Sequence, residues 1–164
     1  MIRAAALTVE AFAPFGDVVS AGLRAGSSAN QGTALRFDRC APLLSSRPEA
    51  RANLAVFRSV PKSLPFEVKL LEKHPHSTQV FLPMRCARFL VCVAPALDGG
   101  APDVSALKAF ICTAGQGVAY KPDVWHHPIL ALDEVAELAM IAYEDGSERD
   151  CVEYPFAHPV LITE

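Results

Sequence analysis

Proline and glycine recur throughout this chain of 164 residues, and they limit its possible folds more than any other feature. Thirteen prolines and nine glycines are scattered among short apolar segments, where they interrupt helices but suit the ends of strands. Several segments alternate, as in FEVKLLE and LKAFICT. Many short strands at spacings of roughly 8–12 residues predict an all-β sandwich or closed barrel. The expected strands are 54–57, 66–72, 78–82, 89–94, 107–113, 118–120, 129–132 and 135–143.

Little of the chain is expected to be helical. Thr8 can cap a short helix over VEAFA, which Pro14 and Gly16 then end. Segment 20–34 is small, polar and rich in glycine, which is typical of a mobile loop, and APLLSSRPEAR at 41–51 is interpreted as a second, variable loop. We therefore predict a few short helical turns and two irregular loops at these segments.

The composition excludes several classes of partner. A net charge of −3 leaves no basic surface for DNA, RNA or anionic lipid. No apolar run approaches the roughly 20 residues of a membrane helix, and the N-terminal apolar stretch is too brief for a signal peptide. With 51% hydrophobic residues and 20% charged residues, residues 1–164 are expected to form a single globular domain.

The five cysteines do not form a recognisable disulfide or zinc pattern. Their number is odd, no two are spaced as C-x-x-C, and three lie in or beside apolar runs. Buried cysteines of this kind are ordinarily reduced, so we expect free thiols in a cytoplasmic protein.

Side chains that bind metals are concentrated in two places. LLEKHPHSTQVFLP contains Glu72, His74 and Gln79, and WHHP contains His126. If 66–74 is a strand, Glu72 and His74 share one face of it, and Gln79 can return to the same space after a turn. A carboxylate, two imidazoles and a carboxamide suit a divalent cation such as Mn, Fe, Co, Ni or Zn. Spacing alone equally allows a solvated strand edge and an aromatic turn with hydrogen-bonded imidazoles.

Two cations are candidates for holding an anionic ligand. Arg58 offers a guanidinium fork and Lys121 an ammonium group, which are the groups that bind a small carboxylate. Either can equally be an ordinary surface charge.

Several motifs together resemble the ureidoglycolate lyase family, long called ureidoglycolate hydrolase. They occur in order along nearly the whole chain, and the most specific are H-P-x-x-x-Q-x-F-x-P and V-W-H-H-P. The matching segments are FAPFGDVV (12–19), NQG (30–32), LEKHPHSTQVFLPM (71–84), FLVCVAP (89–95), DVSALKAFICTAGQGVAYKPDVWHHPIL (103–130) and DC (150–151).

The resemblance implies a cupin-like β-barrel or jelly roll that is usually a homodimer. It also implies an enzyme that splits (S)-ureidoglycolate into glyoxylate and urea, late in allantoin breakdown. In the cupin layout, the metal ligands fall on Glu72, His74, Gln79 and His126 of this sequence. The implied cofactor is a divalent metal, for which the family description usually carries nickel (Ni2+).

The resemblance also assigns roles within the site. His126, Glu72 and His74 are the expected catalytic residues. Neighbouring side chains on a strand point to opposite faces, so only one of these two histidines is expected inside the barrel. The resemblance selects His126 as the inner one, and places His127 outside or in a subunit contact.

The remaining substrate contacts are expected from residue chemistry and rough position. Arg58 and Lys121 are predicted to hold the carboxylate, and Asn30, Gln31 and Tyr120 to contact the ureido group.

Three other functions fit the same fold, because fold does not fix function. One is an enzyme acting on another small 2-hydroxy or 2-oxo acid. The second is hydrolysis of ureidoglycolate to glyoxylate, carbon dioxide and ammonia. The third is a non-catalytic cupin module that senses a small acid such as glyoxylate.

Overall fold

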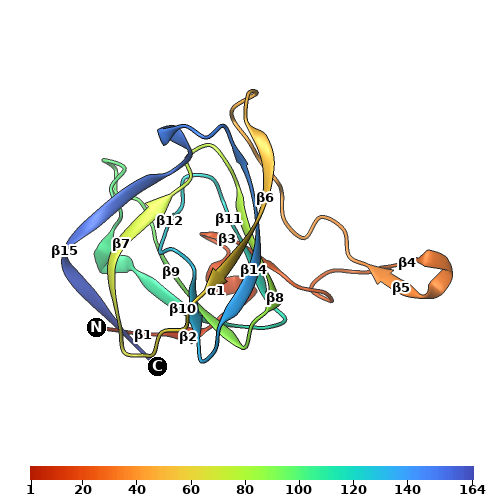
Figure 1. The fold of residues 1–164 in the computed structure, drawn as a ribbon, viewed down its shortest axis with the longest axis horizontal. Coiled ribbons are helices and arrows are strands. Elements are labelled where there is room, and N and C mark those ends of the chain that lie inside the picture. Colours follow the sequence, from red (N-terminus) through yellow and green to blue (C-terminus); the bar gives the residue numbers. More distant parts are fainter.

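The computed structural model describes residues 1–164 and consists mostly of β-strands in two sheets that nearly close into a barrel (Figure 1). The first sheet contains, in spatial order, β1 (Ile2–Arg3), β15 (Val152–Thr163), β7 (Phe66–Lys73), β12 (Trp125–His126), β9 (Arg88–Ala94), β10 (Lys108–Thr113) and β2 (Ala5–Ala6), and β13 (Leu130–Leu132) also pairs with β9. The second contains β3 (Gly16–Val19), β11 (Gly117–Tyr120), β8 (Gln79–Arg85), β14 (Ala136–Glu144) and β6 (Arg51–Ser59). The predicted all-β barrel is therefore confirmed.

Helical structure is limited to short turns. The helix predicted after Thr8 is present as α1 (Val9–Phe12), and the Thr8 hydroxyl accepts a hydrogen bond from the Ala11 amide at 3.2 Å. Its Phe12 side chain is fully buried, which anchors the turn to the core. The other turns are η1 (Asn30–Gly32), η2 (Val104–Ala106) and η3 (Glu148–Asp150). None of these helices is long or apolar enough to cross a bilayer.

Strand β9 is buried on both faces, which explains the uninterrupted apolar run FLVCVA. Its residues Phe89, Val91 and Val93 belong to the core between the sheets, whereas Leu90, Cys92 and Ala94 belong to a second core on the other face of the first sheet. A strand covered on both faces needs no polar alternation. All five cysteines carry free thiols.

Every segment predicted to be a strand overlaps one in the structure, but seven strands were missed, five of them only two or three residues long. The two longer ones are β3 and the twelve-residue β15, which pairs with β7 and β1. Strand β15 contains Pro155 and Pro159, and its pairing with β7 is interrupted between Pro155 and Val160. Proline is tolerated in a strand at such an irregularity.

The two segments predicted as irregular loops are more ordered than expected. Segment 20–34 contributes to a hairpin of β4 (Ser27–Ala29) and β5 (Ala34–Arg36). This hairpin projects from the barrel as an arm (Figure 1). Segment 41–51 lies against the barrel, where Ser45 forms a β-bridge with Ser77 and the Arg47 side chain is buried.

Candidate functional site

Three side chains that can bind a metal converge inside the barrel, near the end at which β7 finishes. Glu72 lies on β7, His74 follows that strand, and His126 lies on β12 directly opposite Glu72. Their ligand atoms all lie within 4.8 Å of one another. Glu72 Oε1 is 3.7 Å from His126 Nε2 and 3.9 Å from His74 Nε2. The structure thus brings together the predicted carboxylate and both predicted imidazoles.

The strand register explains why His126 points inward. Strand β12 has only two residues, and Trp125 packs in the second core, on the face opposite to His126. His126 is 1% exposed. The strand then ends, and the ring of His127 packs edge-on against Phe66 at 5.6 Å, outside the cluster of ligand atoms. Consecutive side chains on a strand cannot share a face, so only one of the two histidines joins the cluster.

Backbone carbonyls fix the orientation of both imidazoles. His74 Nδ1 lies 2.8 Å from the Asp150 carbonyl oxygen, and His126 Nδ1 lies 2.9 Å from that of Val124. A carbonyl oxygen only accepts hydrogen bonds, so each Nδ1 carries the proton. Nε2 of each ring therefore faces the cluster.

Gln79 and Tyr120 complete the surroundings of His126. The Tyr120 ring stacks on the His126 ring with centroids 4.0 Å apart, and the Tyr120 hydroxyl is buried without a hydrogen-bond partner. Gln79 Oε1 lies 3.0 Å from His126 Nε2. Gln79 Oε1 and the unprotonated His126 Nε2 are both acceptors, so a cation bound by both atoms would satisfy them. The alternative is a Gln79 amide turned so that its NH2 group donates to the ring.

Burial and neighbouring charges set the protonation states of the cluster. Burial, reinforced by the neighbouring His74 imidazole and opposed by the Glu72 carboxylate, lowers the pKa of His126 to about 4. Burial raises the pKa of Glu72, but its interactions with His74 and His126 outweigh that effect and leave the pKa below its ordinary value. At neutral pH the cluster therefore offers a neutral imidazole at His126 and a carboxylate at Glu72, the forms that bind metal.

These observations fit a divalent cation. His74 Nε2 is buried with no hydrogen-bond partner in the protein, and it faces the Glu72 carboxylate. An orphaned buried acceptor is rare unless a ligand satisfies it. Glu72, His74 and His126 can thus hold a metal ion, with Gln79 Oε1 placed to join them.

A family model described as ureidoglycolate lyase matches residues 1–163. The chain belongs to the ureidoglycolate lyase family. A relative named ureidoglycolate lyase from Burkholderia mallei is 41% identical over 158 residues, which cover 96% of this chain and 91% of the relative. Another of that name, from Pseudomonas syringae pv. syringae, is 36% identical over 156 residues, which cover 95% and 90% of the two chains. The predicted family is therefore confirmed.

A solved structure supports the cupin-like architecture of this member of the ureidoglycolate lyase family. The dTDP sugar isomerase from Desulfovibrio desulfuricans G20 has a TM-score of 0.53 and 16% sequence identity, and the match covers 87% of this chain and 86% of that one. At this identity, the similarity concerns the fold alone.

Of the five substrate contacts expected in this family member, only Tyr120 lies beside the cluster. Arg58 pairs with Glu137 through two hydrogen bonds, and strand alternation places both on the outer face of the second sheet. The Lys121 ammonium group donates to the Ala13 carbonyl at 2.6 Å. The other two expected contacts, Asn30 and Gln31, lie in η1 at the tip of the projecting arm.

Three residues around the cluster were not identified from the sequence. The Cys151 thiol is 3.9 Å from Glu72 Oε2, Asp150 supplies the carbonyl that binds His74, and Arg47 forms ion pairs with the turn that contains Asp150. The only available signal was the family motif DC at 150–151. No spacing rule connects positions separated by more than seventy residues.

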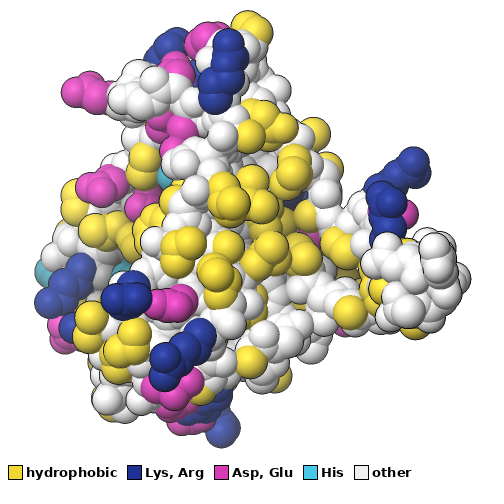
Figure 2. All heavy atoms as spheres, turned by 45° about the vertical axis from the view of Figure 1, so that its right-hand side comes forward, with side chains coloured by type: hydrophobic (Ala, Val, Ile, Leu, Met, Phe, Trp, Pro, Cys, Tyr) yellow, Lys and Arg dark blue, Asp and Glu magenta, His cyan; other side chains and the backbone are white.

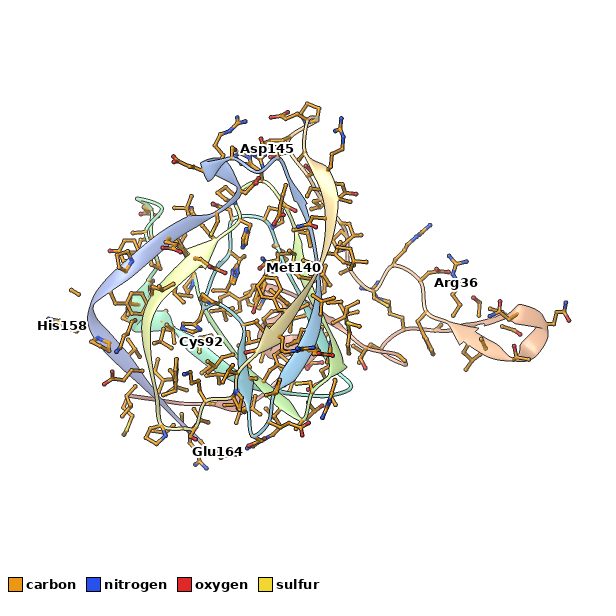
Figure 3. All side chains as sticks on the ribbon, in the orientation of Figure 1. Arg36, Cys92, Met140, Asp145, His158 and Glu164 are labelled. Atoms are coloured by element: carbon orange, nitrogen blue, oxygen red, sulfur yellow. The ribbon has the colours of Figure 1, made fainter.

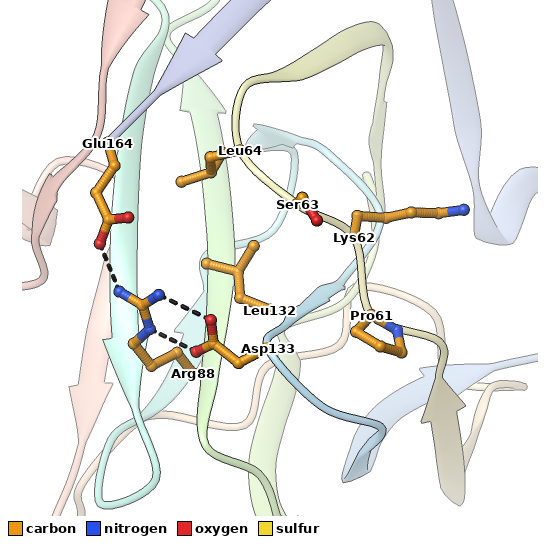
Figure 4. Close-up of a pocket in the computed structure, with 8 residues that line it drawn as sticks. All are labelled: Pro61, Lys62, Ser63, Leu64, Arg88, Leu132, Asp133 and Glu164. Carbon is orange, nitrogen blue, oxygen red and sulfur yellow. Dashed lines mark hydrogen bonds and ion pairs between the residues drawn. The ribbon is translucent and has the colours of Figure 1, made fainter.

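A separate cavity of about 330 Å³ lies at the other end of the barrel from the cluster (Figure 4). Asp145, on the turn near His74, and Glu164 lie at opposite ends of the barrel (Figure 3). Glu164 lines this cavity. Arg88 also lines the cavity, and its guanidinium is already paired with Asp133 and Glu164. Arg88 is therefore not free to bind a carboxylate ligand, and the other cation in the lining, Lys62, forms no ion pair.

Proposed function

We propose that this protein is a lyase that cleaves (S)-ureidoglycolate into glyoxylate and urea. Membership of the ureidoglycolate lyase family over residues 1–163 carries this proposal. The cluster of Glu72, His74 and His126 supports it, because it provides a buried polar centre inside an otherwise apolar barrel.

The proposed cofactor is a divalent metal ion held by Glu72, His74, His126 and Gln79, and nickel is the first candidate. Such an ion, when bound, supplies Lewis acidity to oxygen atoms of the substrate. The donor set is a carboxylate, two imidazoles and an amide oxygen, which suits a borderline cation better than calcium or magnesium.

The reaction rearranges protons without adding water. The hydroxyl proton of ureidoglycolate is removed, the oxygen electrons form the carbonyl of glyoxylate, and the C–N bond breaks. The electron pair of that bond leaves with the ureido nitrogen, which takes up a proton and becomes urea. We assign proton removal to the Glu72 carboxylate, which is ionised at neutral pH, and its protonated form can return the proton to the nitrogen.

Tyr120 is proposed to orient the substrate. Burial raises the pKa of its hydroxyl well above the ordinary value, so the hydroxyl stays protonated. It has no partner in the protein and can donate a hydrogen bond to the substrate.

The product assay tests this activity directly. Purified protein supplied with divalent metal should release urea and glyoxylate in equal amounts from (S)-ureidoglycolate, because no water enters the reaction. Urea, ammonia and glyoxylate are measured separately. Ammonia without urea would identify a hydrolase, and calorimetric binding of glyoxylate without turnover would identify a sensor; either result overturns the proposed lyase activity.

We also propose a homodimer formed through the outer face of the second sheet. Leu54 and Val56, on the edge strand β6, are 71% and 58% exposed, and their partners on β14 are Ile141 and Ala139. Hydrophobic side chains cover much of this face (Figure 2). An exposed apolar face at a sheet edge is ordinarily covered by a partner.

Light scattering is expected to give about twice the chain mass of 17.6 kDa at micromolar concentration. Val56→Asp should convert the protein to a monomer, because it places a charge in the centre of the apolar face. The matched control is Leu97→Asp, in a loop where Leu97 is 52% exposed, and this variant should remain dimeric. A monomeric wild-type protein would refute the proposal.

We propose that residues 1–164 act as one domain and that the protein is cytoplasmic. The five free thiols support a reducing compartment.

A further inference from the structure

The turn between β14 and β15 is held in one conformation by its own side chains. The Asp150 carboxylate accepts hydrogen bonds from the amides of Asp145 and Gly146, the latter at 2.7 Å. Asp145 Oδ1 accepts from the Ser147 amide at 2.9 Å. Because these bonds fix the backbone of the turn, they also fix the position of the Asp150 carbonyl.

Arg47 joins this turn to a distant segment of the chain. Its guanidinium pairs with Asp145 Oδ2 at 2.8 Å and with Asp150 Oδ1. The Arg47 side chain is only 6% exposed, and the two carboxylates are 13% and 14% exposed. Largely buried ion pairs are little screened by solvent, so the two carboxylates are held against one guanidinium fork.

The segment before Arg47 is also tied to the turn that carries His74. The Ser46 amide donates to the His76 carbonyl at 2.9 Å, and Ser45 forms a β-bridge with Ser77. Arg47 therefore lies where the His74 turn and the Asp150 turn meet.

The Asp150 carbonyl is the contact through which this arrangement reaches the cluster. It accepts a hydrogen bond from His74 Nδ1 at 2.8 Å, which places the proton on Nδ1. The opposite ring nitrogen, Nε2, is then the lone-pair atom, and it lies 3.9 Å from Glu72 Oε1 with no other partner. Without this hydrogen bond, the proton would no longer be confined to Nδ1, and the His74 ring could rotate.

We propose that Arg47 is a positioning residue for His74. By holding Asp145 and Asp150, Arg47 fixes the Asp150 carbonyl, and that carbonyl keeps His74 in the Nδ1–H tautomer with Nε2 directed at Glu72 and His126. Groups that orient a metal-binding histidine through its second nitrogen commonly change metal affinity about 10–100-fold when removed. The consequence for metal binding rests on the proposed function, whereas the tautomer does not.

The first test is the tautomer of His74 in the metal-free wild-type protein, read from long-range 1H–15N correlations of the imidazole in mildly alkaline buffer. The expected form has the proton on Nδ1. In Arg47→Met the Nδ1–H form should lose its dominance. A wild-type His74 with its proton on Nε2 would overturn the proposal whether or not the protein binds metal or turns over ureidoglycolate.

The second test is the affinity for Ni2+ alone, measured by calorimetry. Arg47→Met should bind Ni2+ about 10–100-fold more weakly than the wild type. The matched control is Arg149→Met: Arg149 also pairs with Asp145, at 3.0 Å, but its side chain is 62% exposed and forms no ion pair with Asp150. This control should keep the wild-type tautomer and Ni2+ affinity.

A conservative variant separates positioning from folding. Asp150→Asn keeps the backbone carbonyl and the size of the side chain but weakens the pairing with Arg47, so it should shift the tautomer even if Arg47→Met does not fold. If Asp150→Asn, or a folded Arg47→Met, keeps both the wild-type tautomer and the wild-type Ni2+ affinity, the proposal is wrong. A wild-type protein that shows the expected tautomer but binds no Ni2+ would count against the metal assignment and leave the positioning role supported.

Discussion

Replacing His126 with alanine is expected to lower kcat for ureidoglycolate cleavage by about 10²–10⁴-fold, the loss typical of a positioned acid, base or ligand. The His126 side chain is 2% exposed and its Nε2 faces Glu72 and Gln79, so alanine leaves this buried position without an imidazole. Metal content should fall as well, because the cluster loses one of its three closely spaced ligands. Turnover, metal analysis and thermal melting measure these three effects separately.

The adjacent histidine provides the matched control. His127 has the same chemistry and neighbours His126 in sequence, but its ring packs against Phe66 and its Nδ1 lies 2.7 Å from the Pro128 carbonyl. His127→Ala should therefore lower the melting temperature and keep most of the turnover. If His127→Ala is inactive while His126→Ala turns over normally, His126 must be removed from the site.

The second large effect is expected for Glu72→Gln, which should also reduce kcat by about 10²–10⁴-fold. Glutamine keeps the size of the side chain but removes its negative charge. A carboxamide cannot accept the hydroxyl proton of the substrate, and it is a weaker ligand for a divalent cation. Both effects reduce kcat, and the second also reduces metal content at equal protein concentration.

Strand pairing supplies a control for this substitution. Glu153 lies on β15 directly across from Glu72 and is exposed. Glu153→Gln removes one negative charge from the neighbouring strand without touching the imidazoles, so kcat and metal content should stay within about twofold of wild type. Equal losses in the two variants would indicate that the net charge of this region matters, and would contradict a specific role of Glu72 as base and ligand.

The strands could be predicted largely because apolar periodicity is a local property. The continuous apolar run FLVCVA predicted β9, because a strand buried on both faces needs no polar positions. The alternation in FEVKLLE predicted β7, because it is typical of a strand buried on one face. Strand β15 was missed because its prolines interrupt the pattern, and its long pairing with β7 compensates for them only in the folded chain. The hairpin of the arm could not be predicted because its strands are mostly polar and exposed.

The cluster was predictable for a similar reason, but the substrate contacts were not. Glu72 and His74 are two residues apart at the end of one strand, so the sequence predicts a common face for them, and the family motif added His126. The face on which Arg58 lies depends on the register of β6 against β14, and this register pairs Arg58 with Glu137 on the outer face. The proposed positioning role of Arg47 depends on contacts with residues about one hundred positions away, and no local sequence pattern reveals such contacts.

The placement of Trp125 gives the protein an optical reporter next to its proposed metal site. It is the only tryptophan, it is 3% exposed, and its indole N–H donates to the Gly100 carbonyl at 2.9 Å. The Lys73 ammonium group lies 4.7 Å from the ring centroid, and the next residue along the strand is His126. Tryptophan fluorescence of this protein therefore comes from a single environment, and an ion bound on the opposite face of the same two-residue strand should change its intensity without any added dye.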